Sequence, residues 1–269
     1  MGNMPRDGGH LILNNAEYEK LVSEVPDAAV YIRRYFGANE LLHSTVRWCV
    51  WIDNQELEAA SSIPAIRERI QSVLKFRKKS EGKTTNEYAK TPHMFAQRNF
   101  VDGDVIVLPC HSSENREYIP LGYFSDGSIV SNAAQVIYNA TPLIFAPLMS
   151  RMHMVWCRTV GGALESRLRY SKTYCYNPFP FPNMSGSRND GLLQNVFSVL
   201  EAREQFPELT LAELYAPGKM PAPLREAHSQ MDLAVERCYR KKPFSNDEER
   251  LEYLFKLYET MTKKETASA

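Results

Sequence analysis

The sequence predicts an α+β fold, with a mixed α/β domain over residues 1–182 and a small all-α helical domain over residues 192–269. Helix and strand patterns alternate up to residue 182, whereas the patterns after residue 191 are almost all helical. Between them, residues 183–191 read Asn-Met-Ser-Gly-Ser-Arg-Asn-Asp-Gly, which is typical of a linker. With 269 residues, 43% of them hydrophobic, the chain is long enough to bury the core of one large domain or two ordinary ones.

Two helices are expected in the first 80 residues. Asn15 is a candidate N-cap for a short helix that begins with Glu17. Apolar residues recur at helical spacing from Ile63 to Leu74, and Pro64 suits the first turn of that helix. The helix ends in four cations, Lys75, Arg77, Lys78 and Lys79. Cations suit a helix C-terminus, so this end is either a solvated surface or a patch that contacts phosphates.

Four short segments are predicted to be strands because β-branched and aromatic residues dominate them: Arg47–Ile52, Val105–Leu108, Tyr118–Phe124 and Gln135–Tyr138. Turn signals, Ser112-Ser113-Glu114-Asn115 and Ser125-Asp126-Gly127, separate the last three strands. An apolar helix is then expected from Pro142 to Trp156, and it stops at Gly161-Gly162.

Three amphipathic helices are expected in the second domain. One covers Leu192–Leu200, and a second covers Leu224–Tyr239 behind two prolines. Ser245 and Glu248 form a candidate capping box ahead of a third helix that carries Leu251–Tyr258. Together these helices predict a small bundle.

The net charge and the patterns of cysteine and histidine argue against several classes of function. The formal net charge is 0, which argues against a protein that coats nucleic acid by bulk electrostatics, but not against a DNA-reading module beside a more positive domain. The five cysteines form no CxxC, and the six histidines form no HxH, HExxH or Cys/His cluster, so no metal site is expected. No nucleophile motif, signal segment or membrane-spanning apolar run is present, so we expect a cytoplasmic protein with no catalytic residue and no membrane partner.

The most informative segment is Arg158–Pro182, which is rich in charge and then in aromatic residues and proline. Glu165 and Arg167 lie two positions apart, so on an extended segment their side chains point to the same side. Glutamate can accept from the exocyclic amine of cytosine and arginine can donate twice to guanine, so the two can read one base pair. The alternative is a solvated charged hairpin with an internal ion pair.

The segment Asn177–Phe181 (Asn-Pro-Phe-Pro-Phe) is a candidate catalytic motif of amino-group DNA methyltransferases, in which an aromatic residue stacks on a flipped base. Two observations argue against a divergent methyltransferase. Phe179 separates the two prolines, and no strand is followed by a glycine-rich turn that could hold S-adenosylmethionine. We therefore expect a structural role for this segment.

Several long, ordered motifs resemble the specificity region of MmeI-like enzymes, the type IIL restriction–modification proteins. They are Asp7-Gly8-Gly9-His10-Leu11, Lys90-Thr91-Pro92, Arg116-Glu117-Tyr118-Ile119-Pro120, Arg151-Met152-His153-Met154-Val155-Trp156, Arg158-Thr159-Val160-Gly161-Gly162, Arg169-Tyr170-Ser171, Tyr176-Asn177 with Phe-Pro-Phe-Pro, and Arg240-Lys241-Lys242-Pro243-Phe244. These enzymes join a nuclease, a helical connector, an adenine methyltransferase, a target recognition domain and a C-terminal helical domain. The chain resembles only the last two.

The resemblance implies sequence-specific binding of double-stranded DNA in service of adenine methylation and cleavage, as in bacterial-type defence. It implies that the partners are duplex DNA and the methyltransferase domain of a parent polypeptide. No cofactor is expected in this chain, because S-adenosylmethionine would bind the absent methyltransferase domain.

The resemblance also implies roles for particular residues. In the family, the positions that choose bases correspond to Glu165, Arg167, Arg169, Asn132 and Ala133. Family members carry Lys and Asp in place of the first pair, the charge reversal that exchanging C·G for G·C would demand. Glu165 and Arg167 are therefore expected to read one C·G pair, while Arg169 and Ala133 shape recognition of a neighbouring pair.

Contacts to the DNA backbone, or support of the reading loop, are expected from Tyr170, Ser171, Lys172, Arg116 and Arg151. Arg116 could equally be a buried ion-pair partner of Glu117 or Glu114. Two rival functions stay open. One is the divergent methyltransferase that uses Asn177–Phe181, and the other is a protein-docking module without DNA affinity of its own.

Overall fold

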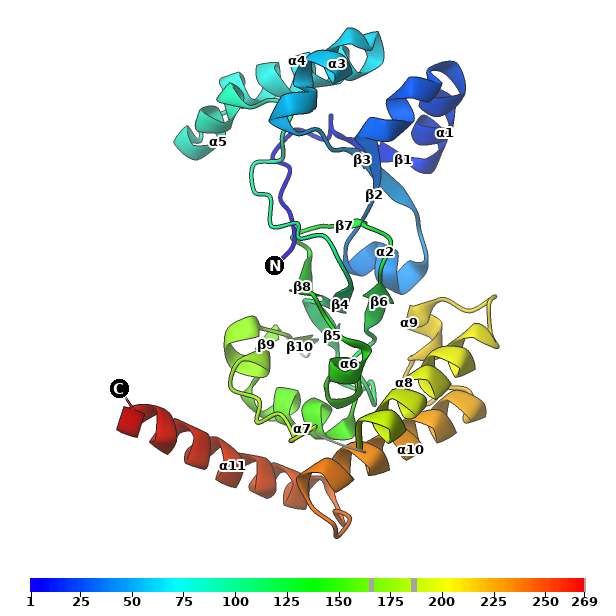
Figure 1. Ribbon diagram of the computed structural model, residues 1–269, viewed down its shortest axis with the longest axis vertical. Coiled ribbons are helices and arrows are strands. Elements are labelled where there is room, and N and C mark those ends of the chain that lie inside the picture. Colours follow the sequence, from blue (N-terminus) through cyan, green and yellow to red (C-terminus); the bar gives the residue numbers. More distant parts are fainter. Residues whose placement is uncertain (165–166, 185–187, 269) are drawn as a thin grey trace. The chain divides into compact units, whose positions relative to one another are not determined.

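The computed structural model describes residues 1–164, 167–184 and 188–268 (Figure 1). The chain divides into two compact units. Unit 1 comprises residues 1–107 and 124–139, and unit 2 comprises residues 108–123 and 140–269. Helix accounts for 52% and strand for 15% of the structure, and the strands form small sheets, which confirms the α+β class.

The core of unit 1 is a four-stranded sheet in the order β1 (Ile12–Asn14), β3 (Arg47–Val50), β2 (Ile32–Phe36) and β7 (Ile129–Val130). The β1–β3 and β3–β2 pairs are antiparallel, and β7 joins β2 in parallel. The sequence predicted β3 correctly because its aromatic and β-branched residues fit a half-buried pleated surface.

Five α-helices belong to the described part of unit 1: α1 (Asn15–Glu24), α2 (Ala38–His43), α3 (Leu57–Ser62), α4 (Pro64–Lys79) and α5 (Lys83–Glu87). Short 3-10 turns also occur: η1 (Pro26–Tyr31), η2 (Asn54–Glu56) and η3 (Tyr88–Lys90). The apolar stripe of α4 (Ile66, Ile70 and Val73) is buried in the core of the unit, as its periodicity predicted. The cap of α1 is Asn14 rather than Asn15, because the Asn14 side chain accepts from the backbone N–H of Glu17, whose carboxylate accepts from the N–H of Asn14.

Arg77, in the last turn of α4, is completely buried. Its guanidinium donates five hydrogen bonds of 2.7–2.9 Å to backbone carbonyl oxygens. The acceptors are Pro5, Arg6, Tyr88, Thr91 and Met94. The sequence placed Arg77 among the solvated cations of the helix end, and this was wrong for Arg77 because one guanidinium carries five donors that buried carbonyls can satisfy.

The Asp7-Gly8-Gly9-His10-Leu11 motif forms a tight turn. The buried Asp7 carboxylate accepts from the backbone N–H of Gly9 (3.1 Å) and of Leu11 (2.6 Å). Gly8 has φ +67°, and a Cβ there would lie 2.7 Å from the Phe76 ring. Only glycine fits this position without strain, which explains the motif in structural terms.

A second sheet has the order β6 (Gly122–Phe124), β4 (Val105–Pro109) and β8 (Ala134–Tyr138). The chain leaves unit 1 within β4 and returns to it within β6. All residues of β4 are buried, as its apolar sequence predicted.

Unit 2 contains the remaining helices. They are α6 (Pro142–Leu148), α7 (Arg151–Val160), α8 (Arg188–Glu204), α9 (Leu211–Leu214), α10 (Ala222–Tyr239) and α11 (Asp247–Ser268), and the π-helical turn η4 (Lys172–Tyr176) precedes α8. In Figure 1, α10 lies alongside α8. Trp156 of α7 contacts the rings of Phe255 and Tyr258 on α11. None of the described helices has the length and apolar character that crossing a membrane requires.

Several helix boundaries in unit 2 differ from the sequence prediction. α8 begins at Arg188, inside the segment expected to be a linker (residues 183–191), and ends at Glu204 rather than Leu200. The helix expected over Pro142–Trp156 is two helices, because Pro147 lacks an N–H donor and Ser150 caps a new helix by accepting from the N–H of His153. The cap of α11 is Asn246 rather than Ser245. Its side chain accepts from the N–H of Glu249 at 2.8 Å.

Asp232 on α10 lies 8% exposed and connects α10 to two other segments of unit 2. Its carboxylate accepts from the Tyr118 hydroxyl and from the Arg151 backbone N–H, each at 2.7 Å. Burial raises the pKa of Asp232 from 3.8 to about 6, although both hydrogen bonds act to lower it.

This raised pKa predicts that the contribution of Asp232 to the stability of unit 2 falls as the pH rises from about 4 to about 7, whereas the lowered pKa values of the buried His153 and His228 make their contributions rise over the same range. In the unfolded chain Asp232 ionises near its ordinary value, so the folded state binds the proton more tightly, and that stability is lost as pH passes through the folded pKa. The shift corresponds to about 3 kcal/mol. The difference in the free energy of urea unfolding between the wild type and Asp232→Asn across this range isolates the Asp232 contribution, because both proteins share the histidine contributions. Asp232→Asn is expected to remove this component, while the exposed Asp190→Asn variant keeps the wild-type profile; equal profiles for wild type and Asp232→Asn would contradict the prediction.

Candidate nucleic-acid interface

The charged segment singled out in the sequence forms part of a three-stranded antiparallel sheet in unit 2. Its order is β5 (His111–Ser113), β10 (Arg167–Arg169) and β9 (Gly162–Leu164). Arg167 pairs with Ser113 on one side and with Leu164 on the other, and Arg169 pairs with His111 and Gly162. Glu165 and Ser166, which join β9 to β10, lie outside the described residues.

Side chains alternate across this sheet. Arg167 and Arg169 are exposed, and Leu168 between them is buried. On β5, His111 is exposed and Ser112 is buried. Residues directly opposite in an antiparallel pair share a face, so both arginines lie on one exposed face with His111 and Ser113.

Arg116 completes a pocket of about 310 Å³ at the edge of this face. The lining residues are His111, Ser112, Ser113, Glu114, Asn115, Arg116 and Arg167. Arg116 is half-buried, its Nη1 donates to the Ser112 hydroxyl at 3.3 Å, and its Nε is buried without a hydrogen-bond partner among the described residues. Burial lowers the pKa of the guanidinium. An incompletely satisfied arginine beside a second arginine favours an anionic ligand.

The three arginines of the candidate site have no carboxylate partner among the described residues. Over residues 1–164, 167–184 and 188–268, no acidic side chain lies within 4.0 Å of the guanidinium of Arg116, Arg167 or Arg169. Glu117, one of the two partners considered for Arg116, instead accepts from Arg225 at 2.5 and 2.6 Å. Among the described residues, no acidic side chain therefore neutralises the positive charge of this face.

Two contacts hold the arginine-bearing segments in place. Arg158 on α7 donates to the carbonyl oxygens of Glu114 (3.2 Å) and Arg116 (2.9 Å), which fixes the turn after β5. Tyr170, directly after β10, is 3% exposed, and its hydroxyl lies 3.0 Å from Nε2 of His153. Burial lowers the pKa of His153 to about 3, so this ring is neutral. Tyr170 thus supports the strand, because a buried hydroxyl cannot reach a phosphate.

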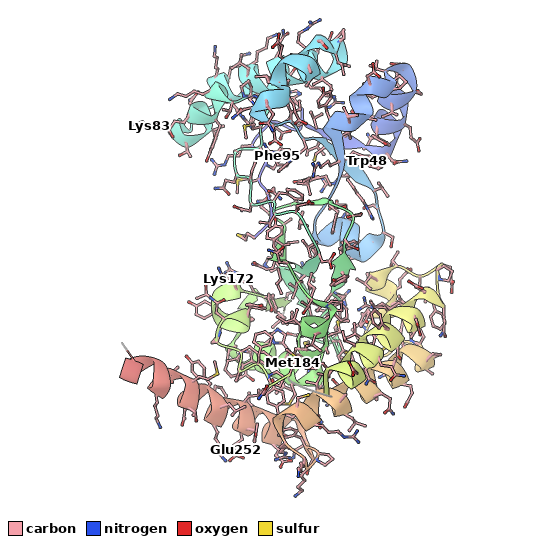
Figure 2. The ribbon with its side chains drawn as sticks, in the orientation of Figure 1. Trp48, Lys83, Phe95, Lys172, Met184 and Glu252 are labelled. Atoms are coloured by element: carbon pink, nitrogen blue, oxygen red, sulfur yellow. The ribbon has the colours of Figure 1, made fainter. Side chains whose placement is uncertain are left out.

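The chain then makes the π-helical turn η4, a type of turn that is frequent at functional sites. The Ser171 hydroxyl caps it by accepting from the N–H of Thr173 at 3.2 Å. The buried Cys175 thiol accepts from the N–H of Ser171 at 3.4 Å. Lys172 is exposed at the start of the turn (Figure 2). Of Tyr170, Ser171 and Lys172, which follow β10, Lys172 is therefore the one that is exposed to solvent.

Asn132 and Ala133 belong to unit 1, where they form the turn between β7 and β8. The Asn132 N–H donates to the carbonyl of Asn3 at 2.9 Å, and Ala133 is exposed. Gly37 allows the start of this turn to pack closely against it, because a Cβ at Gly37 would lie 2.3 Å from the Ser131 hydroxyl oxygen. The turn is thus a rigid, exposed feature of unit 1.

Arg151 has a structural partner. Its guanidinium binds the Asp247 carboxylate through Nε at 2.7 Å and Nη2 at 3.0 Å. The hydrogen bond from Arg151 to Asp247 raises the pKa of Arg151. A phosphate contact by Arg151 would have to replace this bidentate pair, so the residue is better placed to join α7 to α11.

The Asn177–Phe181 segment packs into unit 2. Phe179 is 1% exposed, and its ring lies against His153 and Phe181 with centroids 4.4 and 4.9 Å away. The Pro180 carbonyl accepts from the Tyr239 hydroxyl at 2.9 Å. A buried Phe179 cannot stack on a flipped base, so the geometry supports the structural role and argues against the methyltransferase alternative.

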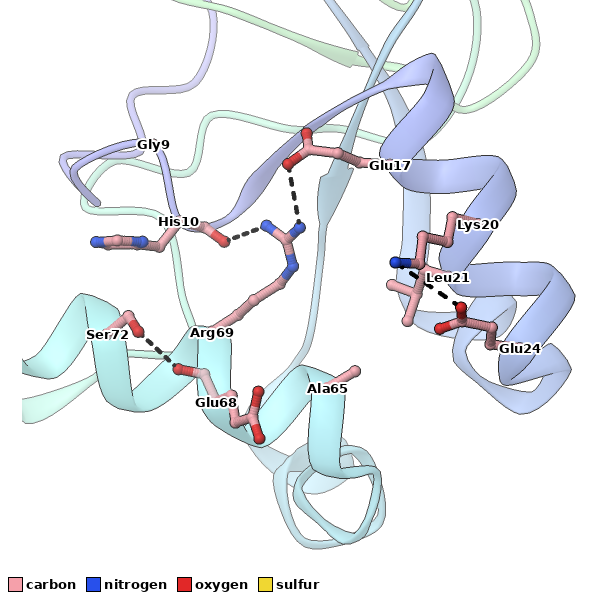
Figure 3. A pocket seen from close by; sticks show the side chains of 10 residues that line it. All are labelled: Gly9, His10, Glu17, Lys20, Leu21, Glu24, Ala65, Glu68, Arg69 and Ser72. Carbon is pink, nitrogen blue, oxygen red and sulfur yellow. Dashed lines mark hydrogen bonds and ion pairs between the residues drawn. The ribbon is translucent and has the colours of Figure 1, made fainter.

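Unit 1 has a larger cleft, of about 500 Å³, between α1 and α4 (Figure 3). Its charged side chains largely satisfy one another. Arg69 lies 3.8 Å from Glu17 and donates to the His10 carbonyl at 2.8 Å, and Lys20 lies 3.9 Å from Glu24. Internally paired charges leave little to attract a charged ligand, so we assign the candidate site to the β5–β10 face.

Sequence reasoning missed part of this site. His111, Ser113 and Asn115 line the pocket, and Arg158 holds its turn. No local pattern identifies them, since β5 and β10 are far apart in the chain. The repeated arginines of the Arg158–Arg169 segment were the sequence feature that indicated a charged site, but they do not show which strand pairs with β10.

The comparisons agree with this architecture. The family described as the MmeI target recognition domain matches residues 1–183, and the MmeI C-terminal domain matches residues 189–265. DNA methyltransferase A of Bacillus subtilis (strain 168) is 42% identical over 263 residues, which cover 98% of this chain and 30% of that protein. A solved structure of the type IIL restriction–modification enzyme MmeI in complex with DNA is 38% identical, with a TM-score of 0.90, over 97% of this chain and 35% of that one.

The chain therefore spans about a third of the length of both relatives. The two family matches follow one another along the sequence and together cover nearly all of it. They confirm the resemblance first seen in the motifs: this chain belongs to the MmeI family and comprises its target recognition and C-terminal domains.

Proposed function

We propose that this chain recognises a short asymmetric site in duplex DNA and presents it to an adenine methyltransferase domain of the same restriction–modification system. One observation carries the proposal. Arg167 and Arg169 project from one exposed strand face, beside the half-buried Arg116, and none of the three has a carboxylate partner among the described residues. Arginines on a rigid strand are suited to reading guanine edges and binding phosphates.

Base recognition is assigned to Glu165, Arg167, Arg169, Asn132 and Ala133. Glu165 and Arg167 together read one C·G pair, with the carboxylate accepting from cytosine and the guanidinium donating to guanine. Arg169 and the Asn132–Ala133 turn shape recognition of a neighbouring pair. This assignment is supported by the exposure of Arg167, Arg169 and Ala133.

Backbone contacts are assigned to Arg116, Lys172 and Ser171. Arg116 and Lys172 carry the charge, and Ser171 holds the η4 turn. For Tyr170 and Arg151 we propose support rather than phosphate contact, because Tyr170 is buried and Arg151 is paired with Asp247. Tyr170 keeps the reading segment in position, and Arg151 joins α7 to α11.

The partners that follow are duplex DNA and a methyltransferase domain, and the cytoplasm stays the predicted location. S-adenosylmethionine would supply the methyl group. The Asn177–Phe181 segment does not fit a site for this chemistry, because Phe179 is buried and Pro180 is bonded to Tyr239. We therefore assign no step of methyl transfer to this chain.

The test separates base reading from phosphate binding. Arg116→Ala is expected to weaken binding to every duplex and to reduce the slope of log K against log[salt] by about 0.9. Arg167→Ala is expected to lose about 1–3 kcal/mol of discrimination at one base pair. Fluorescence anisotropy with the preferred duplex and its single-base variants, over a salt series, measures both effects.

Arg225→Ala is the matched control, since Arg225 is an exposed arginine already paired with Glu117. It should leave both the slope and the preference unchanged. If the wild-type chain binds no duplex even at low salt, the proposal is wrong for this chain and the docking-module alternative stands.

A further inference from the structure

Unit 1 carries a concentration of positive charge that the proposed base-reading site does not use. Residues 75–90 contain six cationic side chains and two carboxylates, a formal net charge of +4 in a chain whose total is 0. Arg6 extends this patch, because its Nη1 donates to the Thr85 hydroxyl at 3.3 Å. We call the exposed or half-exposed cations here the basic surface: Arg6, Lys75, Lys78, Lys79, Lys83 and Lys90.

We propose that the basic surface is a second, sequence-independent contact with duplex DNA, which binds phosphates of the double helix outside the base pairs that are read. This inference rests on the proposed function and adds a second DNA-binding area in unit 1, separate in sequence from the Asn132–Ala133 turn. It concerns affinity and not the choice of sequence, because contacts to phosphates alone carry no base information.

The lysines of the basic surface lack internal partners. All five are exposed, and none lies within 4.0 Å of a carboxylate oxygen in the part of the chain that the structure describes. Two exposed lysines elsewhere do have such partners, since Lys20 lies 3.9 Å from Glu24 and Lys256 lies 2.6 Å from Glu252, whereas the exposed Lys172, Lys219, Lys241 and Lys242 are, like the basic surface, without one among the described residues. The charge of the basic surface is therefore not neutralised within the fold.

The arrangement works against the stability of the isolated protein. Lys75 and Lys79 are four residues apart on α4, a spacing at which like charges repel one another across one helical turn. The helix dipole favours cations in the last turn of α4, which accounts for Lys78 and Lys79. It does not account for Lys83, which begins α5 (Figure 2), where the dipole disfavours a cation. A bound anion offsets both the repulsion between Lys75 and Lys79 and the unfavourable interaction of Lys83 with the α5 dipole.

The basic surface is also preorganised. Arg77 lies beneath it and bonds to carbonyl oxygens of three separate stretches of chain, around residues 5–6, 88 and 91–94. Arg6 is held at φ 45°, a left-handed conformation that is uncommon for arginine and is consistent with a constraint at a functional surface. Cations fixed on a rigid platform lose less entropy when they bind a regular row of phosphates.

The test measures how binding depends on salt. In the 269-residue chain, Lys78→Ala, Lys79→Ala and Lys83→Ala are combined, and log K against log[salt] is measured by fluorescence anisotropy for the preferred duplex and an unrelated one. Each lost phosphate contact should reduce the slope by about 0.9, so the combined variant is expected to lose about 2 to 3 for both duplexes. The preferred sequence should stay the same. Lys→Arg at the same three positions should restore the slope.

A control variant changes the net charge equally: Lys20→Ala, Lys219→Ala and Lys256→Ala, all at exposed positions. It should keep the wild-type slope, and all variants should remain folded under the binding conditions. If the basic-surface variant keeps the wild-type slope, or the control loses as much, the inference is overturned while the proposed function stands. If the wild-type chain enriches no site, the proposed function fails and the inference fails with it.

Discussion

Replacing Arg77 with methionine is expected to destabilise unit 1 by about 3 to 5 kcal/mol. Methionine has a similar length but no donor, so five carbonyl oxygens beneath α4 would lose their hydrogen bonds. A buried acceptor without a partner costs about 1–3 kcal/mol, and relaxation of the surrounding chain recovers part of the total. Arg77→Lys should give an intermediate loss, since an ammonium group has three donors rather than five.

The neighbouring Lys78→Met variant is the control, because Lys78 is exposed on the same turn and is expected to change stability by about 0.5 kcal/mol or less. Urea unfolding gives the free energies, and hydrogen exchange of unit 1 amides assigns the loss to that unit. A loss of less than about 1 kcal/mol for Arg77→Met would mean that Arg77 does not hold these segments together.

Local patterns predicted the elements whose stability comes from one amphipathic face. The apolar residues of α4 and the aromatic residues of β3 appear in the structure where the sequence placed them. Caps were predicted to within one residue. Adjacent polar residues such as Asn14 and Asn15, or Ser245 and Asn246, are chemically similar, and only the backbone decides which one caps.

Long-range contacts could not be predicted in this way. The site depends on pairing of β5 with β10, and nothing in the three residues of either strand specifies the other. Arg77 illustrates the same limit, because its carbonyl partners come from segments up to 72 residues away. From the sequence alone, a cation at a helix end is predicted to be solvated, because the segments that cover it lie far away along the chain.

The second large effect concerns the choice of base. Glu165→Lys combined with Arg167→Asp is expected to change the preferred base pair at one position from C·G to G·C. Lysine in place of the carboxylate would donate to guanine, and aspartate in place of the guanidinium would accept from cytosine. With about 1–3 kcal/mol per good contact, the preference should invert by a factor of about 5 to 150 in each direction.

The structure supports the arginine half of this pair. Arg167 is exposed on β10 and is backed by the buried Leu168, so its guanidinium can reach a groove without disturbing the core. Glu165 lies outside the described residues, and its role rests on the family resemblance. The control is a charge reversal at an exposed ion pair on α11, Glu252→Lys with Lys256→Asp, which should leave the preferred sequence unchanged.

The most direct test of DNA recognition by this chain is enrichment sequencing from a randomised duplex pool at low salt, with the wild-type chain and the Glu165→Lys, Arg167→Asp variant side by side. We predict that the wild type enriches one short asymmetric site and that the variant enriches the same site with C replaced by G at a single position. Enrichment of an identical site by both proteins would show that Glu165 and Arg167 do not read bases. Enrichment of no site by the wild type would contradict DNA recognition by this chain.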